Sequence, residues 1–344
     1  MSGFNKSFNR GFTLIELMVS LVLGLLISAA AVQIYIANAR TTTFQKSGSE
    51  LQDVSVFGIQ QLESHIRIAN LGNSRTSIND TTSQGGIVLT GFNLDIVSKT
   101  TDPKTNEVIQ TDEYKDLQLL TRSTGDTKAN GTTQKWTGVS NMSGTNSDQL
   151  TIQYTNITGS EMIDCENNQV DKNAMVIERY FVRQSTQKNG TLVLACDAGR
   201  LVADTSKPGQ GIKTIQKFTG GDTRDFGGEG MEKITNVDQF NVLLGTQQRP
   251  IKDPASGKIT TQPGMLYLNS YAYNKLTGEK PPITSVKIGL IVSGSTAVLG
   301  NEDQTAFELF DQTQVLTDAT KDARSKKVRN VYQSTILLRN ARAI

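Results

Sequence analysis

The chain has 344 residues, with 35 Lys and Arg against 33 Asp and Glu, and a formal net charge of +2. This balance excludes selection of a strongly charged partner by whole-molecule electrostatics, so nucleic acid is not expected as a direct partner. The length allows a leading helix followed by one large or two modest domains with hydrophobic cores.

The first predicted element is an apolar segment from Phe12 to Ala37, the only stretch in the chain long enough to span a membrane. Lys6 and Arg10 precede it and no acidic residue does. The positive-inside bias therefore predicts cytoplasmic residues 1–11 and an exported remainder. The only charge within the segment is Glu16, and a carboxylate in hydrocarbon costs about 2.5–3.5 kcal/mol and needs a partner.

The position of Glu16 suggests what that partner is. On a continuous helix, Glu16 and Phe12 share a face because they are four residues apart. Cleavage after Gly11 would place a new α-amino group on Phe12, beside Glu16 of the same chain or of a neighbour. The alternative is an ordinary signal peptide or signal anchor, with Ser28 to Ala31 as the cleavage site. That alternative leaves Glu16 without a role.

The run Arg10-Gly11-Phe12-Thr13-Leu14-Ile15-Glu16-Leu17 resembles the processing site of type IV prepilins and of type II secretion pseudopilins. The resemblance implies that residues 1–11 form a leader peptide and that a prepilin peptidase cleaves between Gly11 and Phe12 and methylates the new Phe12 amine. It also implies that the apolar helix packs into a filament core, where Glu16 pairs with a neighbouring N-terminus.

The second half of the predicted helix, 38–70, is amphipathic. No proline occurs before Pro103, so the sequence allows one helix from Phe12 to about Asn70, roughly 90 Å long. Its first part, 38–49, has weak helix propensity, and Leu71-Gly72-Asn73 supplies a stop signal. An apolar stripe at steps of three and four is predicted to face a globular head. The stripe consists of Leu51, Val54, Phe57 or Gly58, Leu62, Ile66 and Ala69, with Gln52, Asp53, Gln60, Glu63 and Arg67 facing away.

The remainder, 71–344, is predicted to be a β-rich head, which makes the chain α+β in class. The predicted strands are rich in β-branched and aromatic residues and have Gly/Asn/Ser-rich flanks. They are Gly86–Thr90, Gln149–Tyr154, Ala174–Val182, Thr191–Cys196, Val237–Leu244, Met265–Leu268, Ser285–Val292 and Val328–Leu338. Gln187 to Gly190 favours a hairpin turn. Asn93–Gln134 and Ile251–Gln262 are predicted surface excursions, and Ala306–Leu316 fits either a helix or a strand.

Cys165 and Cys196 are the only cysteines. In an exported domain such a pair is normally bridged. The closed loop of about 32 residues corresponds to about 3–4 kcal/mol in the chain-entropy model. The alternative is two unrelated buried thiols.

The head resembles that of the PilW-type minor pilins of type IV pili. The segments that carry the resemblance are Glu178–Arg183 with Gly190–Leu192, then Ser285–Val292, and finally Val328–Asn340. The related J-type pseudopilins of type II secretion share this layout. Many major pilins have a kinking proline in the apolar half of the helix; its absence here fits a minor pilin or pseudopilin better.

No residue pattern indicates catalysis. His65 is the only histidine, so neither a Ser-His-Asp site nor a His-based zinc site is expected, and His65 is predicted to lie on the helix face against the head. The glycine-rich stretch Thr219–Gly230 lacks the ending of a phosphate loop and is predicted to be a turn, with calcium binding left open. The basic run Lys321–Arg329 is predicted to be a solvated loop, with contact to DNA or an acidic partner as the alternative.

Together with the resemblance to prepilins and to PilW-type minor pilins, these observations predict a non-enzymatic minor pilin without a cofactor. The partners that the resemblance implies are the prepilin peptidase, the other minor pilins, the major pilin and the inner-membrane assembly platform. The expected location is the inner membrane, with a single span and a periplasmic head, and then the cell-surface pilus. The resemblance implies a role in priming pilus assembly, with twitching motility, adhesion or DNA uptake as the outcome. The alternatives are a J-type pseudopilin and a membrane-anchored ligand-binding module.

Overall fold

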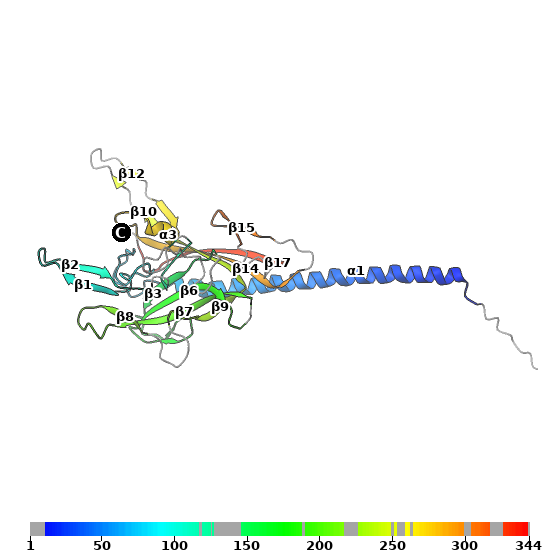
Figure 1. The fold of residues 1–344 in the computed structure, drawn as a ribbon, viewed down its shortest axis with the longest axis horizontal. Helices are drawn as coiled ribbons and strands as arrows, with labels where there is room; N and C mark the ends of the chain where they lie inside the picture. The colour runs from blue at the N-terminus through cyan, green and yellow to red at the C-terminus, as the bar shows by residue number, and fades with distance from the viewer. Residues whose placement is uncertain are drawn as a thin grey trace, which may run out of the picture.

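A computed structural model of the chain describes residues 11–116, 119–124, 126, 146–187, 190–216, 226–248, 251–252, 259–261, 264–298, 304–316 and 326–342. Its dominant feature is a long helix that projects from a β-rich head (Figure 1). The helix comprises α1 (Leu14–Asp53), a π-helical turn η1 (Val54–Ile59) and α2 (Gln60–Arg67). The predicted α+β architecture of a long N-terminal helix and a β-rich head is confirmed.

The first half of the helix makes almost no contact with the head. Side chains from Leu14 to Ile36 are exposed, with Ile27 at 71% and Tyr35 at 73%. An 18-residue window of this helix has a mean hydropathy of 2.4, and none of it is buried. By length and composition, this helix could cross a membrane.

The second half of the helix packs against the head through the predicted apolar stripe. Leu51, Leu62 and Ile66 are buried, whereas Phe57 is 72% exposed. Of the two alternatives at that point, Gly58 is therefore the one that faces the head, where an added Cβ would lie 2.8 Å from Cγ1 of Ile234. The helix ends at Arg67, before the predicted stop signal.

Two antiparallel sheets form the head. One has the strand order β3-β6-β7-β8, with β9 also paired to β7, and the other has the order β13-β10-β14-β17. The bounds of the first sheet are β3 (Leu150–Thr155), β6 (Met175–Gln184), β7 (Leu192–Ala203), β8 (Lys213–Gln216) and β9 (Met231–Thr235). Those of the second are β10 (Val237–Gln248), β13 (Gly264–Leu268), β14 (Ile283–Ala297) and β17 (Lys327–Leu337).

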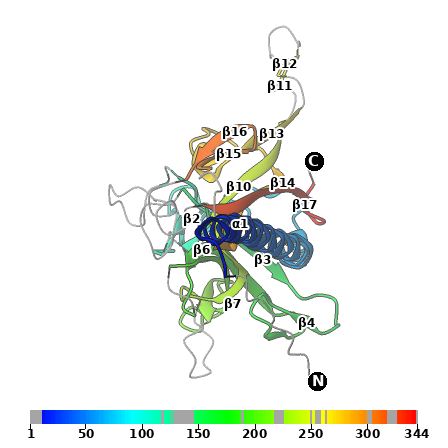
Figure 2. The same ribbon diagram turned by 90° about the vertical axis from the view of Figure 1, so that its right-hand side faces the viewer.

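The helix lies between these sheets. Seen end-on, α1 has β14 and β17 on one side and β6 and β7 on the other (Figure 2). The main core contains side chains from both helical segments and from both sheets, among them Ile66, Leu194 and Val286. The head therefore folds around the C-terminal half of the helix and leaves the N-terminal half bare.

Smaller elements decorate the head. They are the hairpins β1–β2 (Val97–Thr101, Val108–Asp112), β4–β5 (Met162–Ile163, Gln169–Val170), β11–β12 (Ile251–Lys252, Ile259–Thr261) and β15–β16 (Ala306–Leu309, Gln312–Val315), and the short helix α3 (Ser270–Asn274).

Seven of the eight predicted strands are present, most of them longer than predicted. The remaining predicted strand, Gly86–Thr90, is wrong, because this segment forms only an isolated bridge between Ile87 and Ile152. Ala306–Leu316 is a hairpin and not a helix, and the predicted excursion Asn93–Gln134 contains β1 and β2. Strands β1, β2 and β16 are short and mostly exposed, so they lack the hydrophobic alternation that marks a half-buried strand. Strand β15 does alternate, with Phe307 and Leu309 buried, but it is only four residues long.

Candidate functional site

The N-terminal end of the helix is built by a capping box of Thr13 and Glu16. The backbone N–H and the hydroxyl of Thr13 both donate to Oε2 of Glu16, each over 2.9 Å. The backbone N–H of Glu16 donates back to Oγ1 of Thr13 over 3.4 Å. Two backbone donors that a helix start leaves without partners are thus satisfied.

This geometry differs from the prediction that Phe12 and Glu16 share one face of a helix. Phe12 precedes the helix and is 88% exposed, so the two residues do not share a helical face. The capping box instead folds the Glu16 side chain back to the N–H of Thr13, one residue from Phe12. The spacing Thr-x-x-Glu is the sequence signal that could have predicted this contact.

Gly11, the other residue at the expected cleavage point, has nothing within 4 Å of its potential Cβ. The bond between Gly11 and Phe12 is therefore accessible in the structure. Lys6 and Arg10, on which the orientation of the segment was predicted, lie outside the described residues.

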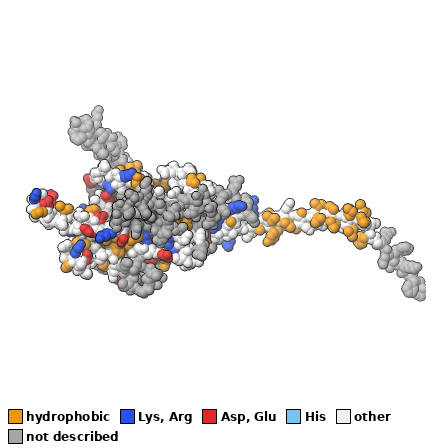
Figure 3. Space-filling view, in the orientation of Figure 1, with side chains coloured by type: hydrophobic (Ala, Val, Ile, Leu, Met, Phe, Trp, Pro, Cys, Tyr) orange, Lys and Arg blue, Asp and Glu red, His pale blue; other side chains and the backbone are white. Residues whose placement is uncertain are grey.

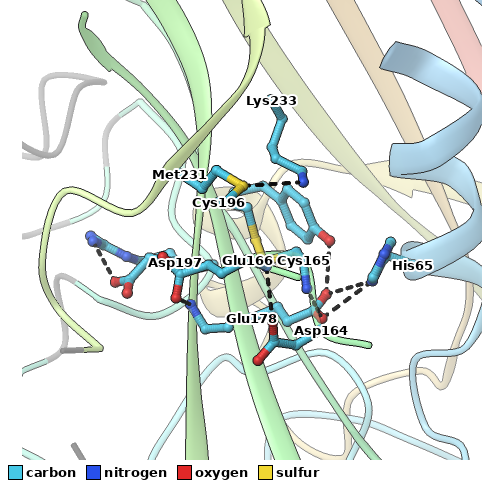
Figure 4. The surroundings of a disulfide bond; sticks show 12 residues. His65, Asp164, Cys165, Glu166, Glu178, Cys196, Asp197, Met231 and Lys233 are labelled. Atoms are coloured by element: carbon cyan, nitrogen blue, oxygen red, sulfur yellow. Dashed lines mark hydrogen bonds and ion pairs between the residues drawn. A yellow bond between two sulfur atoms is a disulfide. The ribbon is translucent and has the colours of Figure 1, made fainter. Parts of the chain in front are cut away.

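A second cluster of chemically active side chains surrounds the disulfide in the head (Figure 4). Cys165, in the β4–β5 loop, is bonded to Cys196 on β7, with Cα atoms 6.1 Å apart. The predicted disulfide is thus present in the structure. Because both sulfurs are in this bond, they are not available as thiolate ligands for a metal.

Glu178 on β6 is the centre of this cluster, and its carboxylate is fully buried. Oε1 accepts hydrogen bonds from the backbone N–H of Cys165 and the hydroxyl of Tyr154, each over 2.9 Å. Oε2 accepts one from the hydroxyl of Tyr180 over 2.7 Å. Nδ1 of His65 lies 3.2 Å from the carboxylate. Four donors from the helix, the first sheet and the disulfide loop therefore compensate for the buried charge.

The pKa values of this pair reflect burial and mutual attraction. Burial alone lowers the pKa of His65, but the attraction of Glu178 and the hydrogen bond to it outweigh burial, and the net shift is upward. Burial alone raises the pKa of Glu178, but the charge of His65 and the hydrogen bonds from His65, Tyr180 and Tyr154 make the net shift downward. The charged pair is thus the favoured state at weakly acidic pH.

The predicted position of His65, on the helix face against the head, is confirmed, since the residue is 9% exposed. Sequence reasoning missed its ion pair, because Glu178 is 113 residues away in the chain. Two further buried ion pairs flank the disulfide, Arg200 with Asp164 at 2.8 Å and Arg179 with Asp197 at 2.9 Å. The charged side chains of the cluster are thus paired with one another, and the pair of His65 and Glu178 joins the helix to the head.

The glycine-rich stretch Thr219–Gly230 is described only from Phe226 onward. The carbonyl of Gly228 accepts a hydrogen bond from Arg179, and those of Glu229 and Gly230 accept bonds from Arg183. This part of the stretch therefore covers buried arginines. Of the basic run Lys321–Arg329, only the part from Lys326 onward is described, and the prediction for the rest lies outside the described residues.

Comparisons with known proteins bear on the N-terminal segment. Residues 6–32 match the family model of the prokaryotic N-terminal methylation motif. A comparison with curated protein sequences gives no match. Among solved structures, the chain is similar to a type IV-like pilin from Thermus thermophilus, with 14% identity and a TM-score of 0.27, over 58% of this chain and 87% of that one. An identity and a TM-score this low do not support a conclusion about the head. The methylation motif is the finding that bears on function.

Proposed function

We propose that this chain is a minor pilin of a type IV pilus, made as a membrane-inserted precursor and cleaved between Gly11 and Phe12. The observation that carries the proposal is a bare apolar helix with one carboxylate near its start, within the N-terminal methylation motif. A soluble domain gains nothing from exposing such a helix, whereas a subunit that moves from a bilayer into a filament needs it.

Cleavage changes the surroundings of Glu16. In the precursor, its carboxylate accepts hydrogen bonds only from Thr13 among the contacts described for it. After cleavage, the methylated amine of Phe12 brings a positive charge next to that carboxylate. A filament places the N-terminus of a second subunit within reach as well. Glu16 is then the residue that selects a neighbour, because a buried carboxylate is stable only when it is paired.

The remaining features fit a structural subunit. The prepilin peptidase processes the chain in the inner membrane, with the head in the periplasm. The bare helix then packs beside those of other minor pilins and the major pilin at the assembly platform. In this role, the cluster around Glu178 fixes the head to the helix, so that a force on one is transmitted to the other. The chain has no catalytic role and needs no cofactor in this proposal.

The N-terminus of the mature protein tests the proposal. We expect mass spectrometry of the chain, purified from cells that contain a prepilin peptidase, to find a first residue Phe12 with one added methyl group. Gly11→Val is expected to leave the precursor uncleaved. Gly24→Val is the matched control, because Gly24 also has nothing within 4 Å of its potential Cβ, and this variant is expected to be processed normally. A mature chain that begins at Met1 or after Ala31 overturns the proposal.

A second measurement decides between a type IV pilus and a type II secretion pseudopilus. For a type IV pilus, deletion of the gene is expected to abolish twitching motility or DNA uptake, and the protein is expected in sheared fibres. Loss of enzyme secretion with normal motility would assign the chain to a type II secretion pseudopilus. Full function with an unrelated transmembrane segment in place of Phe12–Ala37 would show that the helix is only an anchor.

A further inference from the structure

Three exposed arginines belong to the part of the head that is far from the bare helix. They are Arg75, Arg339 and Arg342, and we call them the arginine cluster. Figure 3 shows the apolar side chains of the bare helix at one end of the molecule. The last described residues lie in the part of the head away from that helix (Figure 1).

One buried side chain, Asn70, ties together the two segments that carry the arginine cluster. Its Nδ2 donates to the carbonyl of Arg75 over 3.0 Å and to that of Asn340 over 2.8 Å. Its Oδ1 accepts a hydrogen bond from the backbone N–H of Gly86 over 3.0 Å. Because the side chain of Asn70 is completely buried, these hydrogen bonds fix both segments against the head.

Backbone hydrogen bonds place the other two arginines beside this point. The N–H of Arg342 donates to the carbonyl of Thr76 over 2.8 Å, which puts Arg342 next to the residue that follows Arg75. The N–H of Arg339 lies 3.4 Å from the carbonyl of Arg67, the last residue of α2. This contact fills one of the acceptors that a helix end leaves open. Two segments that are distant in the sequence therefore present the arginine cluster together.

The guanidinium groups of the arginine cluster are open to an external partner. Within the described part of the chain, none of the three forms an ion pair, a side-chain hydrogen bond or a ring contact. Two other cations near them do have acidic partners. Arg67 lies 3.8 Å from Glu63, and Lys280 lies 2.6 Å from Asp80. Both of these acids are thus engaged elsewhere.

A lipid surface is out of reach of the arginine cluster. From Ala37, where the apolar segment ends, to Arg67 the helix rises about 45 Å. Charges at a membrane surface act over about one Debye length, roughly 8–10 Å at physiological salt. If the apolar helix spans a bilayer, the lipid headgroups are therefore too far away to bind these arginines.

Exposed apolar side chains near the arginine cluster favour a protein partner over nucleic acid. Leu337, two residues before Arg339, is 64% exposed, and Ile157 is 53% exposed. Ile157 lies at this end because a Cβ on Gly72 would be 2.9 Å from its Cγ2. Arginine beside exposed apolar side chains is typical of protein interfaces, whereas contacts to a nucleic-acid backbone are polar. The small net charge of +2 also argues against a polynucleotide.

We propose that the arginine cluster binds an acidic peptide segment of another protein. Carboxylates of that segment pair with the three guanidinium groups, each of which can bind a carboxylate through two parallel N–H···O bonds. Apolar side chains of the segment contact Leu337 and Ile157. The proposal goes beyond the pilin function, because it concerns a surface that the bare helix and its processing site do not use.

Binding of defined polymers to the full chain tests this proposal. The protein is kept in a neutral detergent at about 0.05 M salt, and fluorescence anisotropy gives its Kd for a labelled copolymer of glutamate and tyrosine. We expect Arg75→Gln/Arg339→Gln/Arg342→Gln to weaken binding at least about tenfold, because three exposed charge pairs are lost. At about 0.5 M salt, wild-type binding should fall towards that of this variant.

Matched variants separate the position of the charges from their number. Lys46→Gln/Lys104→Gln/Lys207→Gln removes three exposed charges from α1, the β1–β2 turn and the β7–β8 loop. It is expected to bind the copolymer as tightly as wild type. Replacing all three arginines of the cluster by lysine keeps the charge but removes the planar fork, and the Kd should stay within about threefold of wild type.

A second pair of variants tests the apolar contact. The readout is the preference of the protein for the glutamate–tyrosine copolymer over polyglutamate. Leu337→Ser is expected to lower this preference by about two- to fivefold, because apolar contact area is lost. Ile109→Ser on β2 is the matched control, since Ile109 is 50% exposed, and it should leave the preference unchanged.

The outcomes are distinct from those that test the proposed function. The acidic-peptide proposal is overturned if the wild-type chain does not bind the copolymer, or if the glutamine variant of the arginine cluster binds it equally well. Tighter, cluster-dependent binding of a DNA duplex at the same charge concentration would assign the arginines to nucleic acid instead. None of these measurements depends on cleavage after Gly11, so a failure here leaves the pilin function standing.

Discussion

At the scale of single residues, the buried carboxylate of Glu178 needs hydrogen-bond donors to compensate for its charge. A fully buried carboxylate is tolerated only when its hydrogen-bonding capacity is filled. His65, Tyr154, Tyr180 and the N–H of Cys165 fill it. We expect Glu178→Ala to destabilise the head by about 3–5 kcal/mol, because it leaves these donors buried without an acceptor.

The pair of Glu178 and His65 should make stability depend on pH. Since the pKa of His65 is raised above 6.5 in the folded state, its contribution is full below 6.5 and is lost as the pH rises through the raised value. Since the pKa of Glu178 is lowered below 4.5, its contribution is full above 4.5 and is lost as the pH falls through the lowered value. Both contributions are full only between these limits.

The variant His65→Gln tests this dependence. We expect it to lower the free energy of unfolding by about 1.5–3 kcal/mol at about pH 5.5, because a charged hydrogen bond is lost. At about pH 9 the difference from wild type should shrink, because His65 is then neutral in both the folded and the unfolded chain. Denaturant titrations of the detergent-solubilised protein at the two pH values measure it. An equal difference at both values would show that His65 acts through packing alone.

At the scale of elements, the π-helical turn η1 decides how the helix meets the head. A π-helical turn accommodates an extra residue and so rotates the residues that follow it relative to those before. Leu51 and Leu62 face the core on either side of this turn, while Phe57 faces solvent. Gly58 is the residue at the contact, and a Cβ there would lie 2.8 Å from Cγ1 of Ile234 on β9. Only a residue without a side chain allows this close approach.

We therefore expect Gly58→Val to destabilise the helix–head contact by about 1–3 kcal/mol through overpacking. Gly48→Val is the matched control on the same helix, since a Cβ at Gly48 has nothing within 4 Å. This variant should change the free energy of unfolding by less than about 0.5 kcal/mol. Denaturant titration of both variants measures the contrast. Combining Gly58→Val with Ile234→Ala should give less than the sum of the single effects; strict additivity would mean that the two side chains do not meet.

At the scale of the whole molecule, the chain divides into a bare half-helix and a head wrapped around the other half (Figures 1 and 2). In the proposed function, the bare half-helix is surrounded first by lipid and then by neighbouring helices, whereas the other half stays packed in the head. Lipid and a filament core are equally apolar, so apolar contact alone does not favour assembly over the membrane. The charge of Glu16 favours the filament over the membrane, because an amine can pair with this carboxylate in the filament.

We expect Glu16→Val to leave the chain inserted in the membrane but to reduce its incorporation into filaments at least tenfold. The reason is that the variant removes the charge pair and keeps the apolar surface. Immunoblots of sheared pili against membrane fractions measure the ratio. Glu63→Gln, in the docked half of the helix, is the control and should assemble normally. Unchanged incorporation of Glu16→Val would remove Glu16 from the assembly mechanism.

The amino-acid sequence by itself determined the features that depend on neighbouring residues and on composition. The apolar run with its single carboxylate, the stripe of Leu51, Leu62 and Ile66, and seven of the eight predicted strands follow from local periodicity. The pairing of Cys165 with Cys196 follows from there being only two cysteines in a chain that the sequence predicts to be exported. The hairpin β1–β2 was missed because its mostly exposed side chains carry no alternating pattern of burial, and for Ala306–Leu316 the sequence left a helix and a strand open.

The tertiary structure alone decided what depends on contacts between distant segments. It brings His65 to Glu178 and chooses Gly58 over Phe57 at the contact with Ile234. Each of these joins residues more than 100 positions apart, and no periodicity in a single segment encodes such a meeting. They arise because the two sheets close around one helix and bring side chains from distant segments into the same core.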